Sequence, residues 1–400
     1  MQTSDAVSAV AAYLSRGVAS MRLLIAAATC VARALYAVLK AFLPARHKVV
    51  FLSRQSDAPS RDFVMLADAL LARDPDLEIV MNCRMVGAGA GDRAAAAVAT
   101  IGQMYHLATS EACVVDGYVI PVSLLRHRKG LFVVQMWHAL GAIKRFGYQT
   151  VGRPGGHSAA IATAMRMHRN YDLVLCGGPA TVPVFAEAFG VDPSIVTPLG
   201  LPRIDYLLAA AEAGRSGALP AASSAIRDAF PLLNDPSRTV LLYAPTLRKG
   251  GEHRYRDVAE RFAGPRYTLV IKPHPLETAR IEGSNVVNAG GIDVLDLLPL
   301  CSAVITDYSA VAFEAAVIDL PVYFYVYDND AYARDCGLNI DPLVEMPEAS
   351  SRDIGEIADR IEAGEDHAEI TRSMKARYAS APAGCAGRIA DTIIETIRAS

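Results

Sequence analysis

Short apolar runs recur along the whole of this 400-residue chain, and stretches of helical pattern lie between them. In the first half the runs occupy 48–52, 77–82, 113–116, 131–136 and 171–176, with helices expected over 63–72, 159–168 and 181–189. In the second half the runs occupy 239–243, 267–271, 286–287, 303–306 and 322–326. Strands that alternate with helices in this way form parallel sheets covered by helices on both faces. The pattern therefore predicts an α/β fold with two facing, Rossmann-like, doubly wound domains.

The length of the chain also suits two domains, because 400 residues exceed what one ordinary hydrophobic core holds. Residues 209–237 are rich in Ala, Gly, Ser and Pro, which is typical of a connection. We predict a leader over 1–47, a first domain over 48–208, a linker over 209–237 and a second domain over 238–400.

Charge and cysteine usage narrow the possible partners. The net charge of −3 gives no general attraction to nucleic acid, so an anionic partner must be held by local patches. The seven cysteines are odd in number and show no CxxC spacing. This usage argues against a disulfide framework and a structural zinc site, and it fits a reducing cytoplasm.

The leader is basic and free of acidic residues between Asp5 and Asp57. On a helix of about 100° per residue, Arg22, Arg33 and Lys40 fall within about 20° of one another. Most of the remaining surface is apolar, and a wide apolar face with a narrow basic stripe suits a helix lying on an anionic membrane. The longest apolar run, 23–32, is too short to cross a bilayer, which needs roughly 20 apolar residues.

Three other interpretations of the leader compete with membrane contact. They are a helix that docks on the body of the same protein, a helix that mediates dimerisation, and a cleaved signal peptide. Recurring arginines argue against a signal peptide, whose basic residues come first. Docking and oligomer packing stay open.

Polar side chains follow several of the expected strands, where ligands bind in open α/β sheets. The first such loop carries Trp137 and His138, followed by the paired cations Lys144 and Arg145. A histidine at a strand end suits a general base near neutral pH, and the two cations suit an anionic acceptor. A Trp-His pair that only plugs the end of the sheet is the structural alternative.

A second loop holds His274 between two prolines and beside Lys272. Because proline fixes φ and favours an extended residue before it, His274 is expected to be held rigidly near a phosphate oxygen. A stiff turn without chemistry is the alternative.

Two further loops in the second half offer groups for a diphosphate. Asp307 or Ser309 can cap the helix that follows, and the N terminus of that helix favours anions. Glu314, further along, would meet a ribose hydroxyl or pair with a cation. Thr246 and Arg248 would add a hydroxyl and a fixed cation.

At these loops the chain resembles the CDP-glycerol glycerophosphotransferase family, whose members prime and extend wall teichoic acids. Similar motifs occur in the same order over roughly 48–345. They are Gln135-Met-Trp-His138, Tyr243-Ala-Pro-Thr246, Lys272-Pro-His-Pro275, Thr306-Asp-Tyr-Ser309 and Asp319-Leu-Pro-Val-Tyr-Phe-Tyr-Val-Tyr-Asp328, with Ser53-Arg-Gln-Ser56 and Gly200-Leu-Pro-Arg-Ile-Asp205 upstream.

The resemblance implies a GT-B architecture and a peripheral enzyme on the cytoplasmic face of the cell membrane. It implies transfer of an alditol phosphate from CDP-glycerol or CDP-ribitol to a lipid-linked or polyol-phosphate acceptor, with release of CMP. His138 would match the proposed base of the family, His274 its second essential histidine, and Asp307 and Ser309 its donor loop. No cofactor is expected, and Asp328-Asn-Asp330, although of DxD form, is assigned no metal.

Departures from the family pattern put the substrate in doubt. Ala139 stands where glycine is common, Leu247 where tryptophan is common, and Ala310 where a second serine is usual. Two rival functions therefore remain in play. One is a nucleotide-sugar glycosyltransferase on the same fold, and the other is a non-catalytic nucleotide-binding scaffold, which would need no base.

Overall fold

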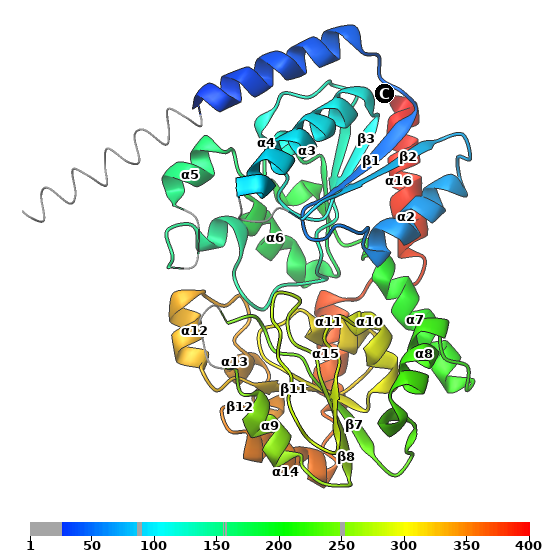
Figure 1. The fold of residues 1–400 in the computed structure, drawn as a ribbon, viewed down its shortest axis with the longest axis vertical. Coiled ribbons are helices and arrows are strands. Elements are labelled where there is room, and N and C mark those ends of the chain that lie inside the picture. Colours follow the sequence, from blue (N-terminus) through cyan, green and yellow to red (C-terminus); the bar gives the residue numbers. More distant parts are fainter. Residues whose placement is uncertain (1–25, 86–89, 155, 157, 249–252) are drawn as a thin grey trace, which may run out of the picture.

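The computed structural model describes residues 26–85, 90–154, 156, 158–248 and 253–400. Two α/β domains lie one above the other, with the first domain at the top of Figure 1. Each is built on a six-stranded, wholly parallel sheet. The predicted α/β class with two facing domains is confirmed.

The first sheet has the order β2-β1-β3-β4-β5-β6. Its strands are β1 (Lys48–Ser53), β2 (Glu78–Cys83), β3 (Ala112–Val115), β4 (Phe132–Gln135), β5 (Leu173–Leu175) and β6 (Val196–Thr197). All six residues of β1 are buried, which is why this run reads as continuously apolar rather than alternating. The two-residue strand β6 was not predicted, because so short a segment carries no periodicity.

Helices of the first domain are α2 (Arg61–Leu71), α3 (Ala90–Thr109), α4 (Ile120–Leu124), α5 (Ala159–Ala164) and α6 (Val182–Phe189). Helix α5 is shorter than the predicted span 159–168. Arg166 and His168 adopt positive φ angles of 49° and 57°, so the chain leaves the right-handed helical conformation there.

The second sheet has the order β12-β11-β10-β7-β8-β9. Its strands are β7 (Thr239–Tyr243), β8 (Tyr267–Ile271), β9 (Val286–Asn288), β10 (Ala303–Thr306), β11 (Val322–Tyr325) and β12 (Ser350–Ser351). The helices around it are α9 (Tyr255–Arg261), α10 (Val294–Leu297), α11 (Val311–Val317), α12 (Asn329–Asp335), α13 (Pro342–Glu345), α14 (Ile354–Ala363) and α15 (Ala368–Tyr378).

The connection between the sheets is mostly helical. Helix α7 (Pro202–Arg215) and helix α8 (Ala221–Ala229) run beside the second domain in Figure 1, and the 3₁₀ turn Pro231–Asn234 leads into β7. The alanines of 209–237 thus act as helix formers, and only short pieces around Gly217 and Asp235 are irregular.

The last helix, α16 (Cys385–Ala399), returns to the first domain and packs beside α2 (Figure 1). Arg73 pairs with Asp391, and Arg398 pairs with Asp74 at 3.0 Å. The span 238–400 is therefore one stretch of sequence whose final helix covers the other domain.

Part of the predicted leader forms a helix over 26–42, while residues 1–25, including Arg22, lie outside the described residues. Tyr36 is 1% exposed, and its hydroxyl donates to His127 Nδ1 at 2.9 Å. Lys40 Nζ donates to the carbonyl of Arg126 at 2.6 Å. The line of the helix that carries Tyr36 and Lys40 therefore docks on the first domain. No helix in the described ranges is long and apolar enough to cross a bilayer.

Candidate active site between the two domains

Loops at strand ends of both domains face one another across the domain boundary. The loop after β4 reaches the second domain, where the amide of Arg145 donates to Gly337 O at 3.0 Å and the amide of Asn339 donates to Ile143 O at 2.7 Å. The loops after β7, β8 and β10 supply groups from the other side. The predicted site residues are thus brought to one boundary, although they do not all point into it.

One ring nitrogen of His138 is held by the backbone of the first domain. Its Nδ1 lies 2.9 Å from the carbonyl oxygen of Asp116, which can only accept, so the neutral ring carries its proton on Nδ1. Nε2 keeps its lone pair and has no partner within the described parts of the chain. The ring is exposed, yet the protein that surrounds it lowers the pKa of His138 to about 4, and nearby Arg203 and Lys144 act in the same direction. A neutral imidazole with a free acceptor nitrogen suits a proton acceptor.

Trp137 fixes the backbone just before this histidine. Its φ of +60° is uncommon outside glycine, and its amide donates to Gln135 Oε1 at 2.8 Å. The indole stacks on Phe146, with ring centroids 4.9 Å apart, and lies against His138 at 4.1 Å. Positive φ at a bulky residue is a strained conformation of the kind found at functional sites, and here packing of the indole holds it.

His274 has the opposite tautomer. Its Nδ1 accepts the amide hydrogen of Leu276 at 3.2 Å, so its neutral ring carries the proton on Nε2. Burial, with Lys144 and Lys272 nearby, lowers the pKa of His274. The side chain is half-buried and is held in the Pro-His-Pro turn as the sequence suggests. His274 is therefore equipped to donate a hydrogen bond where His138 is equipped to accept a proton.

Asp307 turns inward rather than toward a ligand. Its carboxylate accepts the amide of Thr246 at 2.9 Å and Nη1 of Arg248 at 2.7 Å, and it is 1% exposed. Arg248 also pairs with Asp328 at 2.8 Å. Burial alone would lower the pKa of its guanidinium, but the charges of Asp307 and Asp328 outweigh burial and raise it. Asp307 and Arg248 thus join the loops after β7 and β10 to each other, and the part in donor binding predicted for them stays a prediction.

Hydroxyl groups remain available beside this ion pair. Thr246 Oγ1 is buried and has no hydrogen-bond partner among the residues that the structure describes. Ser309 is half-buried, and its Oγ meets the amide of Val311 only at 3.5 Å, too long for a good cap. Helix α11 begins at Val311 after Ala310, so neither Asp307 nor Ser309 caps it in the predicted way. Lys272 lies nearby, and its Nζ contacts the carbonyl of Pro273 at 3.3 Å.

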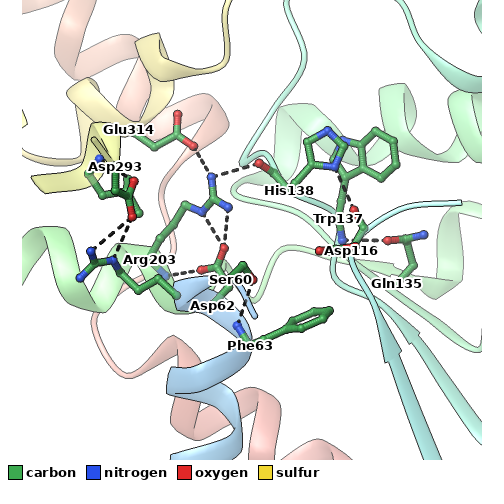
Figure 2. A network of polar contacts seen from close by, with 12 residues as sticks. Ser60, Asp62, Phe63, Asp116, Gln135, Trp137, His138, Arg203, Asp293 and Glu314 are labelled. Atoms are coloured by element: carbon green, nitrogen blue, oxygen red, sulfur yellow. Dashed lines mark hydrogen bonds and ion pairs between the residues drawn. The ribbon is translucent and has the colours of Figure 1, made fainter. Parts of the chain in front are cut away.

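Glu314 meets a cation, one of the two roles left open for it. Figure 2 shows its carboxylate bonded to Arg203, with Nη1 to Oε1 at 2.8 Å. Arg203 is also held by Asp62 and donates to the carbonyl of His138 at 3.0 Å. Oε2 of Glu314 is buried and meets no hydrogen-bond partner in the described part of the chain. Arg203, Asp62 and Asp116 were not predicted, since their contacts join residues far apart in sequence.

Lys144 and Arg145, predicted to bind the acceptor, separate in the structure. The guanidinium of Arg145 donates to Leu338 O at 3.2 Å and serves the contact between domains. Lys144 lies near Asp307 and Arg248, and burial lowers the pKa of its ammonium. Of the two cations, Lys144 is the one whose charge lowers the pKa of both His138 and His274.

No group of three or more His, Cys, Asp or Glu side chains that could hold a metal occurs among the described residues. Asp328 is paired with Arg248, and Asp330 is paired with Arg352 at 2.6 Å. The carboxylates of the DxD sequence therefore face arginines.

Two facing parallel-sheet domains are the architecture of GT-B-type group transferases. Here the first domain carries a proton acceptor, and the second carries hydrogen-bond donors that suit a phosphate. Residues 35–398 match the family model described as CDP-Glycerol:Poly(glycerophosphate) glycerophosphotransferase. The chain belongs to this family, which confirms the resemblance and makes the protein a phosphotransferase of teichoic-acid-type polymer synthesis.

Relatives include enzymes for both alditols. The chain is 31% identical over 354 residues to the teichoic acid ribitol-phosphate primase of Bacillus spizizenii, covering 85% of this chain and 88% of the relative. It is 27% identical over 247 residues to the teichoic acid glycerol-phosphate primase of the same organism, covering 59% and 61%.

Solved structures agree on the fold. The wall teichoic acid polymerase TagF, soaked with CDPG, superposes with a TM-score of 0.71 at 18% identity, covering 92% of this chain and 93% of that one. Staphylococcus aureus MnaA with UDP superposes with a TM-score of 0.56 at 11% identity, covering 88% and 97%.

Proposed function

We propose that this protein transfers an alditol phosphate from CDP-glycerol or CDP-ribitol to a lipid-linked or polyol-phosphate acceptor and releases CMP. The observation that carries the proposal is the pair of histidines with opposite tautomers on facing domains. One ring nitrogen is free to take a proton and the other is able to donate a hydrogen bond. Membership of the family supports the reaction class, and relatives named for both alditols leave two donors to be tested.

In the proposed reaction, an acceptor hydroxyl attacks the β-phosphorus of the donor, which carries the alditol. The hydroxyl proton passes to Nε2 of His138 as the new P–O bond forms. The bond from the β-phosphorus to the bridging oxygen breaks, and its electron pair leaves with CMP. Phosphoryl transfer depends mainly on positioning and charge stabilisation.

Stabilisation of the diphosphate is assigned to groups at the boundary between the domains. His274 would donate from Nε2, and Thr246 and Ser309 would donate from their hydroxyls. Lys144 and Lys272 would supply positive charge, while Asp307 and Arg248 hold the loop that presents Thr246. Such donors are most effective when they are fixed before the reaction.

The test is CMP release by the full-length protein with each CDP-alditol and a lipid-linked acceptor in liposomes. We expect acceptor-dependent release that is lost in H138A and H274A and kept in H47A, a matched surface histidine variant. Retained turnover in folded H138A would remove the base assignment. Silence with both donors and turnover of a UDP-sugar would replace the function with glycosyl transfer.

We also propose that the helix over 26–42 contacts the cytoplasmic face of an anionic membrane. Opposite to the docked face, Val31, Leu35, Val38 and Phe42 are exposed, Phe42 by 80%. Their spacing of four, three and four residues places them on one line of the helix. An exposed apolar row of this kind favours insertion at the bilayer interface.

Positive charge lies around this row. Arg33 and Arg46 are exposed, and so are Arg126 and Lys129 in the loop on which the helix docks. Basic side chains near a membrane surface are each worth about 1 kcal/mol with anionic lipids. A helix that docks through Tyr36 and Lys40 and turns this apolar row outward is compatible with both self-docking and membrane contact.

Vesicle co-sedimentation tests this contact. We expect V38D/F42D to lose binding to phosphatidylglycerol-containing liposomes, and V344D, which changes an exposed valine on α13, to keep it. Salt should weaken wild-type binding because it screens the basic residues. Undiminished sedimentation of V38D/F42D would exclude this face as the membrane contact.

A further inference from the structure

Arg203 lies where the loop that carries His138, helix α2 and the second domain meet (Figure 2). Its Nε contacts Asp62 Oδ2 at 2.8 Å, and its amide donates to Asp62 Oδ1 at 2.7 Å. Both contacts lie within the first domain. Asp62 is buried and therefore fixes the guanidinium in one orientation.

The remaining arm of the guanidinium joins two groups that chemistry must bring together. Nη1 donates to the carbonyl of His138 at 3.0 Å and to Oε1 of Glu314 at 2.8 Å. His138 is the proposed base on the first domain. Glu314 belongs to α11, the helix that follows the proposed donor loop at Ser309. Nη1 of Arg203 thus connects the backbone of His138 with helix α11.

We propose that Arg203 is a positioning residue that couples the donor-side helix α11 to the placement of the base His138. The inference rests on the proposed function and adds a role for a residue that the proposed reaction does not use. A planar guanidinium suits this role because its fork holds Asp62 on one side while Nη1 serves the other two groups. Lysine would keep the charge but offer no such fork.

A second contact between the same domains provides a matched control. Arg61, which precedes Asp62 on α2, pairs with Asp296 at 2.7 Å and with Asp293 at 3.3 Å, both in the second domain. Arg61 has no contact with His138 among the described residues. A change at Arg61 therefore weakens the association of the domains without moving the base.

Charge and geometry can be separated by two substitutions. The charged groups that face His138 are Arg203 and Lys144, which lower its pKa, and Asp62, which raises it; Asp116 acts through its carbonyl. R203K keeps the positive charge, so the acid limb of the pH–rate profile should stay in place. R203Q removes the charge, so the pKa of His138 should rise and the limb should move to higher pH.

The experiment compares CMP release by R203K, R203Q, E314A and R61K. We expect kcat to fall about 10- to 100-fold in R203K and E314A, as for a base displaced by about 1 Å, with donor KM nearly unchanged. E314A leaves Arg203 paired with Asp62, so it tests the same connection even if the arginine variants fail to fold. R203K/E314A should be no slower than either single variant, since both break one connection.

Three results would overturn the coupling: R61K as slow as R203K, E314A with wild-type kcat, or additive losses in the double variant. An NMR titration of His138 in wild type, R203K and R203Q reads the same coupling without turnover. If the wild-type protein releases no CMP, the proposed function fails by itself. An unshifted His138 titration in folded R203Q would still count against the role of Arg203.

Discussion

His138 and His274 differ in chemistry because each has a different backbone contact at Nδ1. A carbonyl beside Nδ1 of His138 leaves Nε2 as an acceptor, whereas an amide beside Nδ1 of His274 leaves Nε2 as a donor. The sequence shows two histidines at strand ends but does not show which nitrogen is free. The same applies to Arg248, whose pairing with Asp307 and Asp328 the sequence does not show.

The pH profile of kcat/KM tests the state of His138. Because its pKa is lowered to about 4, the ring is neutral near pH 7, and protonation removes the acceptor lone pair only at low pH. We expect activity to be flat with respect to this group down to about pH 5 and to fall below it. The lowered pKa would be contradicted if kcat/KM instead fell around the ordinary pKa of histidine. That fall would also have to disappear in a folded variant in which another base replaces His138.

Substitution of Asp307 by asparagine tests its structural role. D307N leaves buried Arg248 with one carboxylate and places an amide near the amide of Thr246. Breaking a buried pair of this kind costs about 3 kcal/mol, so urea unfolding should show a loss of that order. D330N, which alters an exposed pair with Arg352, should change stability by less than about 1 kcal/mol.

At the scale of elements, helix α16 shows how one side chain fastens the end of the chain to the first domain. The carboxylate of Asp205, near the start of α7, accepts the amides of Gly384, Cys385 and Ala386 at 2.7 to 2.9 Å. Free amides and the dipole at a helix N terminus favour such a carboxylate. Asp205 therefore joins α7 to α16 by charge as well as by packing.

Loss of this carboxylate should loosen α16. We expect D205A to lower the free energy of unfolding by about 1 to 2 kcal/mol, as for a lost helix cap. Amide hydrogen exchange should accelerate in α16 first. D192A, which removes a single amide contact at an exposed turn, is the matched control and should have a smaller effect. Equal exchange in D205A and wild type would mean that apolar packing alone holds α16.

Across the whole molecule, close backbone approaches keep the two domains in register. A Cβ on Gly141 would lie 3.0 Å from the ring of Phe313 in the second domain. A Cβ on Gly177 would lie 2.3 Å from the carbonyl oxygen of Tyr378 and 2.8 Å from that of Leu140. Backbone atoms cannot yield as side chains do, so the second position is the stricter one.

We therefore expect G177A to separate the domains slightly. Stability should fall by about 1 to 3 kcal/mol, as for overpacking, and kcat should fall because the histidines lie on opposite domains. G130A is the control, since nothing lies within 4 Å of its added Cβ. Wild-type turnover in G177A would show that the domain boundary tolerates this displacement.

The sequence by itself determined the class of fold and the residues at strand ends. Runs such as 48–52 and 267–271 are apolar because parallel strands are buried on both faces, and this local signal survives without knowledge of the partners. His138, His274 and Thr246 were found because they follow such runs. The family motifs pointed to the same loops, and the family itself is confirmed.

Only the tertiary structure decided where these side chains point and what they meet. Arg203 and Glu314 are 111 residues apart in the sequence. Many pairs with the same separation are not in contact, so the separation does not predict this contact. The inward turn of Asp307, the outward apolar row of the helix over 26–42 and the return of α16 likewise depend on distant parts of the chain. Local sequence sets periodicity and strand ends, whereas the direction of a buried charge is set by the nearest available partner in space.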